Sequence, residues 1–237
     1  TNRYLIDNYH DKEIEKEELR KVYLDIEIEV IDGFPSVEKA NNKILAITCY
    51  DNVLKKYYNF AIKEDIKTVE NGISYYWFTN EKDMLNKFLD FIHDTDPEIL
   101  IAWNLDGFDM PYIINRLSKL KIKTNRLCRM NEEALAIRDN DSFKCKVFGR
   151  VLLDLLWVYK KISQGERESY KLEYISQYEL GEGKEKYEGD IKDLYKDFNK
   201  FIKYNIRDVE LLVLLDEKLK LIDFFDAIRR YSKTKRT

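Results

Sequence analysis

Lys21-Val22-Tyr23-Leu24-Asp25-Ile26-Glu27-Ile28-Glu29-Val30 is the stretch that decides the fold, because it alternates strictly between apolar and polar side chains. Successive side chains of a strand point to opposite faces, so one face is apolar and packs into a core. The other face carries Asp25, Glu27 and Glu29, about 7 Å apart at a rise of roughly 3.3 Å per residue. Carboxylates this close repel one another unless they are well solvated or share a cation. The stretch is therefore either a half-buried edge strand with a solvated acidic face or half of a metal site.

The composition is that of a globular chain without linkers. Its 237 residues suffice for one large domain or two small ones, and 44% are hydrophobic, enough for a substantial core. Gly and Pro are scarce, at 8 and 3 residues, which disfavours a chain of many modules. The net charge of -3 lacks the basic footprint of many nucleic-acid-binding proteins, but local patches matter more than the sum.

The cysteines and the hydropathy bear on the compartment. Cys49, Cys128 and Cys145 are odd in number and widely spaced, which predicts neither a disulfide framework nor a zinc site and favours a reducing cytoplasm. No apolar run reaches the roughly 20 residues of a membrane span, and no signal peptide is visible. We therefore expect a cytoplasmic protein with no membrane partner.

The rest of the chain predicts an α/β domain. Residues 1–20 are polar and predict an exposed connector. A β-hairpin is predicted from 134–138 and 143–148, which flank Asp139-Asn140-Asp141-Ser142. Strands followed by alternating strands and helices are typical of a mixed sheet with helices packed on it. Apolar periodicity predicts strands at 43–50, 53–61, 72–78 and 98–103, helices at 81–93, 109–120, 170–178 and 198–221, and a strand running into a helix at 151–162.

A second candidate site lies in residues 99–109, where an apolar strand ends at a polar loop that opens a helix. Polar residues at the carboxyl edge of such a strand are where sites tend to lie in α/β sheets. Asp109 is also a good helix N-cap, with Pro111 in the first helical turn. Asn104 also suits a turn, and Phe108 also suits the core.

A third candidate is the pair Tyr204 and Asp208 in the last long helix. The two residues are four positions apart and therefore share one helix face. Taken alone, the two residues are better explained as a surface pair beside the apolar ridge of the helix. The D-x-E spacing of Asp25 and Glu27 recurs elsewhere, for example at Asp11 and Glu13, so the alternating strand around it carries the evidence.

Taken in chain order, the three candidates form a recognisable set. A D-x-E in an early strand, an N-x-x-x-F-D at a later strand end and a Y-x-x-x-D in a late helix resemble the DEDD 3′–5′ exonucleases of the ribonuclease-H-like fold, in their tyrosine subclass. The histidine subclass would have His at Lys203, whereas the only two histidines, His10 and His93, lie far from it.

Longer motifs are similar to the proofreading exonuclease of family B DNA polymerases, nearest to those of large tailed bacteriophages. The resemblance covers about residues 22–221 and implies a mixed sheet flanked by helices with an inserted β-hairpin, either the family's strand-separating hairpin or an ordinary sheet extension. Two positions depart from the family pattern. Ile28 stands where many members have Thr, and Lys171 stands where related sequences often have Ser or Thr. The matching segments are 102–113, 169–175, 183–189 and 204–209.

The resemblance also implies roles for individual residues. Asp25 would bridge two Mg²⁺ or Mn²⁺ ions, which oxygen ligands suit. Glu27 and Asp208 would hold the ion that binds the nucleophile, and Asp109 would serve the other ion through water. Tyr204 would orient the attacking water. The remaining implied residues are Lys184 at the phosphate, unless it is an ordinary loop lysine, and Asn104, Phe108, Leu172 and Tyr187 at the DNA.

The function implied is removal of nucleotides from single-stranded or frayed DNA 3′ ends. We expect a connector at 1–20, an exonuclease domain at 21–221 and an extension at 222–237 toward an absent polymerase region, so that the chain cannot synthesise DNA. The implied partners are a single-stranded DNA 3′ end and the polymerase domains of a parent protein, in the cytoplasm of a phage-infected bacterium. The alternatives are a stand-alone exonuclease acting on DNA or RNA, or a catalytically silent DNA-binding domain.

Overall fold

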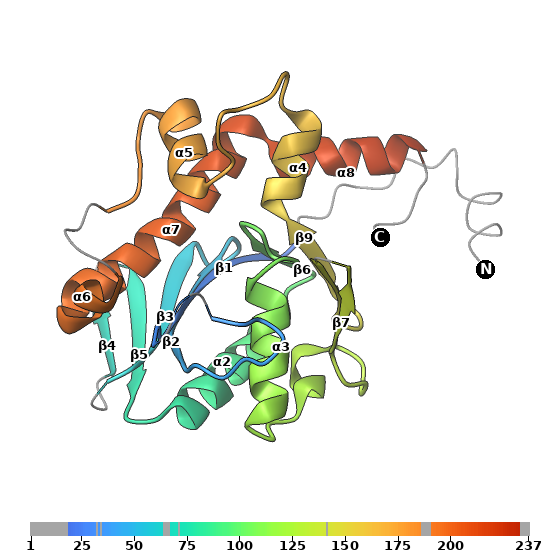
Figure 1. Ribbon diagram of the computed structural model, residues 1–237. Helices are drawn as coiled ribbons and strands as arrows, with labels where there is room; N and C mark the ends of the chain where they lie inside the picture. The colour runs from blue at the N-terminus through green and yellow to red at the C-terminus, as the bar shows by residue number, and fades with distance from the viewer. Residues whose placement is uncertain are drawn as a thin grey trace.

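A seven-stranded mixed sheet forms the centre of the computed structural model, in the order β4-β5-β3-β2-β1-β6-β9, with helices on both faces (Figure 1). This arrangement confirms the predicted α/β class.

The residues described are 19–31, 33, 35–63, 67–70, 72–140, 142–185 and 191–232. The strands are β1 (Lys21–Ile28), β2 (Ile44–Asp51), β3 (Lys56–Ile62), β4 (Lys67–Glu70), β5 (Ile73–Phe78), β6 (Ile99–Ala102), β7 (Leu135–Asp139), β8 (Ser142–Lys146) and β9 (Val151–Asp154). The helices are α2 (Glu81–Thr95), α3 (Asp109–Lys119), the short 3-10 helix η1 (Thr124–Leu127), α4 (Leu155–Ile162), α5 (Leu172–Leu180), α6 (Ile191–Lys196), α7 (Phe198–Leu219) and α8 (Leu221–Ser232).

Strand β1 lies inside the sheet. It pairs antiparallel with β2, where Asp25 faces Thr48, and parallel with β6 on its other side. The edge-strand interpretation is therefore wrong. The strand also ends two residues earlier than predicted, because the register shifts between Glu27 and Ile28.

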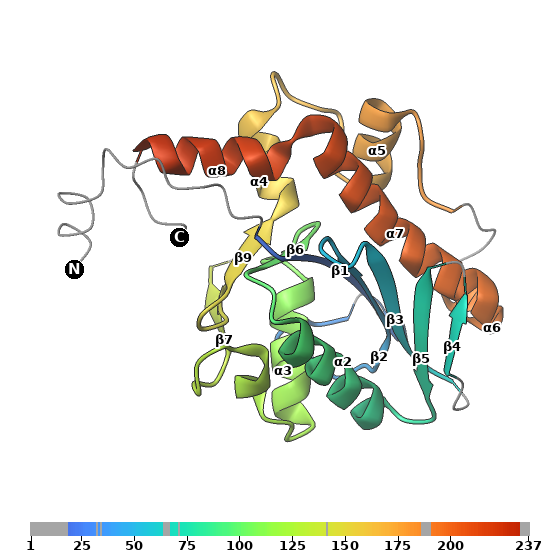
Figure 2. The same ribbon diagram turned by 180° about the vertical axis from the view of Figure 1, so that it is seen from behind.

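The alternation of β1 places one apolar face in a core, as predicted, and the opposite face borders a second core that was not predicted. The apolar side chains from Val22 to Ile28 pack with α2 and α3. Tyr23, on the opposite face, packs with α4, α5 and α7. Figures 1 and 2 show α7 running obliquely across the sheet, so the acidic face of β1 is covered by a helix.

The last long helix of the prediction is α7, and a further helix, α8, follows it almost at once. Helix α7 ends at Leu219, Lys220 adopts a left-handed conformation with φ of 52°, and α8 starts at Leu221. Leu221 and Ile222 are buried, at 1% and 3% exposed, because α8 packs back onto α4. The predicted helix over 198–221 is therefore confirmed to within two residues, whereas α8 was not predicted, and neither a glycine nor a proline separates the two helices.

Short elements account for the other differences. Strand β4 and helices η1 and α6 were not predicted, because four to six residues are too few to show a period. Strands β7 and β8 form an antiparallel pair outside the main sheet, close to the predicted hairpin bounds. Nearly all of the predicted connector, 1–18, lies outside the described residues.

Candidate active site

Three acidic side chains meet between β1 and α7. One carboxylate oxygen from each of Asp25, Glu27 and Asp208 lies within 4.8 Å of the others. The strand places Asp25 and Glu27 on one face, and α7 crosses that face with Asp208. Glu27 and Asp208 are 8% and 2% exposed, and Asp25 is half-buried. We call these three residues the acid cluster.

Asp109 lies beside the acid cluster. It is the first residue of α3, and the N-cap position belongs to Phe108, which makes no side-chain cap. The N-cap interpretation of Asp109 is therefore wrong. Burial raises the pKa of the Asp109 carboxyl, and the nearby Asp25 adds to the rise, while a hydrogen bond from the Ile26 backbone opposes it. These partners place Asp109 against β1, although it is not among the three residues within 4.8 Å.

The acid cluster is short of positive charge. Burial, together with the neighbouring Asp208, raises the pKa of Asp25 to about 8. Burial and Asp25 likewise raise the pKa of Glu27. Buried carboxylates behave in this way when the charges nearby repel them more than they neutralise them.

Lys184 supplies one positive charge. Its Nζ donates a hydrogen bond to Oδ2 of Asp208 and another to the Tyr204 hydroxyl at 3.1 Å. Burial lowers the pKa of Lys184, but Asp208, Tyr204 and Asp25 outweigh it and raise the pKa, so the side chain stays cationic. Burial and Asp208 raise the pKa of Tyr204, which keeps the phenol neutral. Tyr204 is 9% exposed and Asp208 is 2% exposed, so the surface-pair interpretation is wrong.

The loop that carries Lys184 is held by two residues that the sequence did not reveal. The Lys184 backbone N–H donates to Oε2 of Glu173, and Nε of Arg207 donates to the Gly183 carbonyl at 3.2 Å. A Cβ at Gly183 would lie 2.5 Å from Oε1 of Glu173, so a larger residue there would displace the Glu173 carboxylate that holds the loop. The sequence signal for this support is the glycine before Lys184 and the arginine before Asp208.

The residues of the acid cluster fit a divalent cation. The Oδ1 atom of Asp208 is buried without a hydrogen-bond partner among the described residues, which is costly unless a ligand occupies it. Carboxylate oxygens are the ligands that Mg²⁺ and Mn²⁺ prefer. Asp25, Glu27 and Asp208 are therefore the residues that would hold such an ion.

Comparison with known proteins agrees with this geometry. Residues 2–175 match the exonuclease domain of DNA polymerase family B. The chain belongs to this family. It is 31% identical to the DNA-directed DNA polymerase of Escherichia phage RB69, over 97% of this chain and 29% of the relative. The DNA-directed DNA polymerase of Enterobacteria phage T4 is 29% identical over the same shares, and the DNA polymerase of Pyrococcus glycovorans is 30% identical over 88% of this chain and 26% of the relative.

These findings confirm the predicted resemblance to family B proofreading exonucleases, including those of phages. The chain spans less than a third of the length of these relatives. No helix in the described ranges is long and apolar enough to cross a membrane.

An apolar groove adjoins the acid cluster of this exonuclease domain. It has a volume of about 370 Å³ and reaches Glu27 and Phe108. Asn104 is exposed and left-handed, with φ of 66°, and its carbonyl accepts from the Gly107 and Phe108 N–H groups at 3.0 Å. Asn104 therefore closes the turn that presents Phe108 to the groove. The other lining residues are Ile26, Ile28, Val30, Gly33 and Pro35.

The remaining residues predicted to contact DNA are placed differently. Leu172 is 6% exposed and packs in the core with Tyr23 and α7, so little of its side chain is available to a strand. Tyr187 lies outside the described residues. Glu29 follows β1 and is not a member of the acid cluster.

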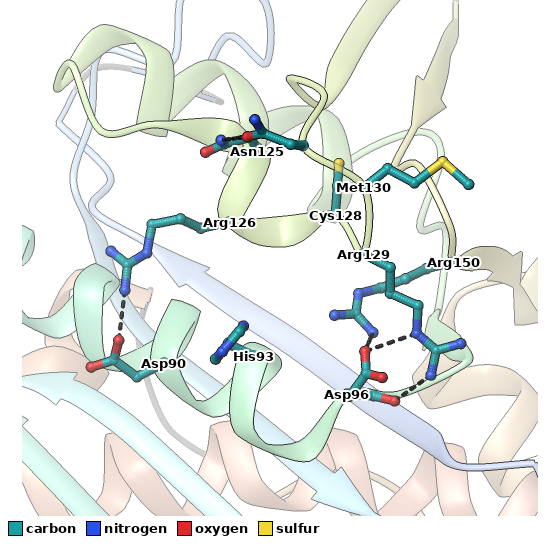
Figure 3. A pocket seen from close by; sticks show the side chains of 10 residues that line it. Asp90, His93, Asp96, Asn125, Arg126, Cys128, Arg129, Met130 and Arg150 are labelled. Atoms are coloured by element: carbon teal, nitrogen blue, oxygen red, sulfur yellow. Dashed lines mark hydrogen bonds and ion pairs between the residues drawn. The ribbon is translucent and has the colours of Figure 1, made fainter.

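A larger polar pocket of about 900 Å³, here called the arginine pocket, lies beside the amino end of β6 (Figure 3). Arg129 and Arg150 both donate to Oδ1 of Asp96 at 2.8 Å. Arg126 donates to Asp90 at 2.6 Å. These arginines are paired within the protein, so the arginine pocket lacks the charge imbalance of the acid cluster.

Proposed function

We propose that this exonuclease domain hydrolyses single-stranded or frayed DNA from the 3′ end, dependent on two Mg²⁺ or Mn²⁺ ions. One observation carries the proposal: the acid cluster joins three carboxylates, and Oδ1 of Asp208 is buried without a hydrogen-bond partner in the part of the chain that the structure describes. Membership in the family B exonuclease domains supports it.

The proposed ligands are Asp25, Glu27 and Asp208, with Asp109 acting through water. Bound divalent cations supply a more acidic water and neutralise charge on the leaving 3′ oxygen. The carboxylates would hold the cations in place, and burial of the carboxylates between β1 and α7 strengthens their attraction for the cations.

Tyr204 and Lys184 complete the proposed reaction site. The neutral Tyr204 hydroxyl is an orienter of the attacking water, because a phenol with a raised pKa is a poor base near neutral pH. The Lys184 ammonium lies at both Tyr204 and Asp208, where it would attract a scissile phosphate. The loop contacts to Glu173 and Arg207 keep that ammonium in place.

The substrate of the proposal is a single strand bound with little sequence preference. Phe108 and the apolar groove provide a surface for the terminal base, and stacking of this kind contributes roughly 1–3 kcal/mol per base. Asn104 is exposed at the start of the turn that leads to Phe108. On the β7–β8 pair, Leu135 and Ile137 are 41% and 49% exposed, which suits contact with unpaired bases.

The wider setting is also part of the proposal. The mixed sheet around β1 supports a ribonuclease-H-like arrangement, and the relatives' names support a parent DNA polymerase as partner. The proposed exonuclease region is 21–221, and α8 packs on it through α4.

The test is digestion of a 5′-labelled oligonucleotide with Mg²⁺ or Mn²⁺. We expect a ladder of products shortened from the 3′ end, abolished in Asp25→Ala/Glu27→Ala and retained in the matched control Glu29→Gln. No shortening, or equal activity in the double variant, would refute the proposal. Binding without shortening would indicate a silent DNA-binding domain, and faster cleavage of an RNA oligonucleotide would indicate a ribonuclease.

A further inference from the structure

Four hydrogen bonds link the surface residue Trp77 to the acid cluster through the interior. The Trp77 indole N–H donates to Oδ1 of Asn59 at 3.0 Å, and Nδ2 of Asn59 donates to the Thr48 hydroxyl at 2.9 Å. Thr48 donates to Oδ1 of Asn205 at 2.5 Å, and Nδ2 of Asn205 donates to Oδ2 of Asp25 at 2.8 Å. We call this chain the relay; it crosses β5, β3, β2 and α7 before it reaches β1.

The middle residues of the relay are fully buried. Thr48, Asn59 and Asn205 are each 0% exposed. Asp25 faces Thr48 across β1 and β2, and Thr48 faces Asn59 across β2 and β3. Asp25, Thr48 and Asn59 therefore lie in one row on one face of the sheet. Buried polar groups destabilise a fold unless they are hydrogen-bonded, and apolar side chains would fill these positions at lower cost. Packing therefore does not explain why polar residues occupy all three positions.

The direction of the relay is fixed at both ends. An indole N–H only donates, and an ionised carboxylate only accepts. Each amide and hydroxyl between them must therefore accept on the Trp77 side and donate on the Asp25 side, which also settles how both asparagine amides are oriented. Hydrogen bonds aligned in this way polarise and strengthen one another. Every donor in the relay consequently points toward the Asp25 carboxylate.

We propose that Asn205, Thr48 and Asn59 are positioning residues that fix the orientation of the Asp25 carboxylate for a divalent cation. The proposal rests on the proposed function. An aspartate carboxylate rotates broadly about its last torsion, and a hydrogen bond to one oxygen removes that freedom. Asn205 also lies on α7 between Tyr204 and Asp208, so the same bond holds α7 against β1 at the acid cluster. Loss of such outer partners typically costs about 10–100-fold in metal affinity or activity.

The test is a calorimetric titration of the complete chain with Mn²⁺, which does not depend on nuclease activity. Thr48→Val keeps the shape but removes the hydroxyl, and we expect it to weaken Mn²⁺ binding about 10-fold. Thr48→Ser keeps the hydroxyl, and we expect affinity within about threefold of wild type. The matched control is Thr95→Val, because Thr95 is also buried but donates to the Phe91 carbonyl in α2, away from the relay.

The relay further predicts a graded series. We expect the loss of Mn²⁺ affinity to fall in the order Asn205→Ala, Thr48→Val, Asn59→Leu and Trp77→Phe, because each later change leaves more of the relay intact next to Asp25. Thermal midpoints measured without metal separate this order from general destabilisation. If Thr48→Val does not fold, Trp77→Phe decides, since Trp77 is only half-buried.

Two results would overturn the relay: wild-type Mn²⁺ affinity in a folded Thr48→Val or Trp77→Phe chain, or losses that follow the thermal midpoints instead of the order along the relay. A wild-type chain that binds Mn²⁺ but cleaves no oligonucleotide would refute the proposed function and leave the relay standing. A wild-type chain that binds no Mn²⁺ would overturn both.

Discussion

The acid cluster and the arginine pocket are both rich in charged residues, yet the pKa values of their carboxyl groups shift in opposite directions. In the arginine pocket, hydrogen bonds from Arg129 and Arg150 outweigh burial and lower the pKa of Asp96. In the acid cluster, burial and Asp208 raise the pKa of Asp25 to about 8. The arginine pocket has the larger volume, about 900 Å³ against about 370 Å³ for the groove beside the acid cluster. Uncompensated buried charge, more than cavity size, therefore distinguishes a candidate site from a structural ion-pair network.

The largest expected difference between the two regions is in the digestion rate after one carboxylate is removed from each. We expect Asp208→Asn to lower the rate of 3′ digestion by about 10³-fold, equivalent to about 4 kcal/mol of transition-state stabilisation. Asp96→Asn, the matched change in the arginine pocket, should leave the rate within about twofold. Single-turnover digestion of a labelled oligonucleotide measures both. Equal rates in the two variants would contradict the assignment.

The next effect concerns Lys184, which donates a hydrogen bond to Asp208 of the acid cluster. We expect Lys184→Met to reduce the digestion rate by about 100-fold, or about 2.7 kcal/mol, because the ammonium at Tyr204 and Asp208 is lost. Gly183→Ala should give a smaller loss of the same kind, since its Cβ would push against Glu173 and displace the loop. A kcat unchanged in Lys184→Met would return this residue to the class of ordinary loop lysines.

Stability should respond in the other region. Arg150 is nearly buried and donates to Asp96 and to the carbonyls of Pro97 and Leu127. We expect Arg150→Met to lower the free energy of unfolding by about 2 kcal/mol, because these acceptors lose their donor. Urea denaturation measures this loss. Mn²⁺ affinity should not change, and a weakened affinity would show that the two regions are coupled.

The smallest expected effect is on pH dependence. The pKa of Asp25 is about 8 in the folded chain and about 4 when unfolded, so the folded state binds more protons between these values. Stability without metal should therefore fall as pH rises from about 4 to about 8, by about 1 kcal/mol or more. Asp25→Asn should make the curve less steep, leaving the part due to Glu27 and Asp109, whose pKa values are also raised by burial, and saturating Mn²⁺ should flatten it further. Denaturation at pH 5 and pH 8 with a chelator checks this, and stability that rises over that interval would contradict it.

Local pattern predicted one half of the acid cluster, and only the family resemblance predicted the other half. The alternation around Asp25 and Glu27 is visible in ten residues, because a strand has a period of two. Asp208 is brought to them by α7 crossing the sheet, and no local period records that contact. The N-cap at Asp109 was the weakest of these predictions, since an Asp at this position suits both an N-cap and the first turn of a helix.

The relay was not predicted, although its residues left a trace. Thr48 interrupts the otherwise apolar stretch of β2, and Asn59 interrupts the aromatic stretch of β3. A single polar residue in an apolar strand is a common event, so neither carries weight alone. Their meaning depends on cross-strand register, which a sequence without its fold does not contain.

Trp77 gives this domain an optical property as well as a structural one. Its indole N–H is the outer end of the relay, and the chain has only two other tryptophans, Trp103 and Trp157. With those two replaced by Phe, the emission of the remaining indole would report hydrogen bonding at a point four hydrogen bonds away from the Asp25 carboxylate. Occupancy of the acid cluster would then be readable in real time from β5, three strands away on the same face of the sheet, with no label attached to the DNA.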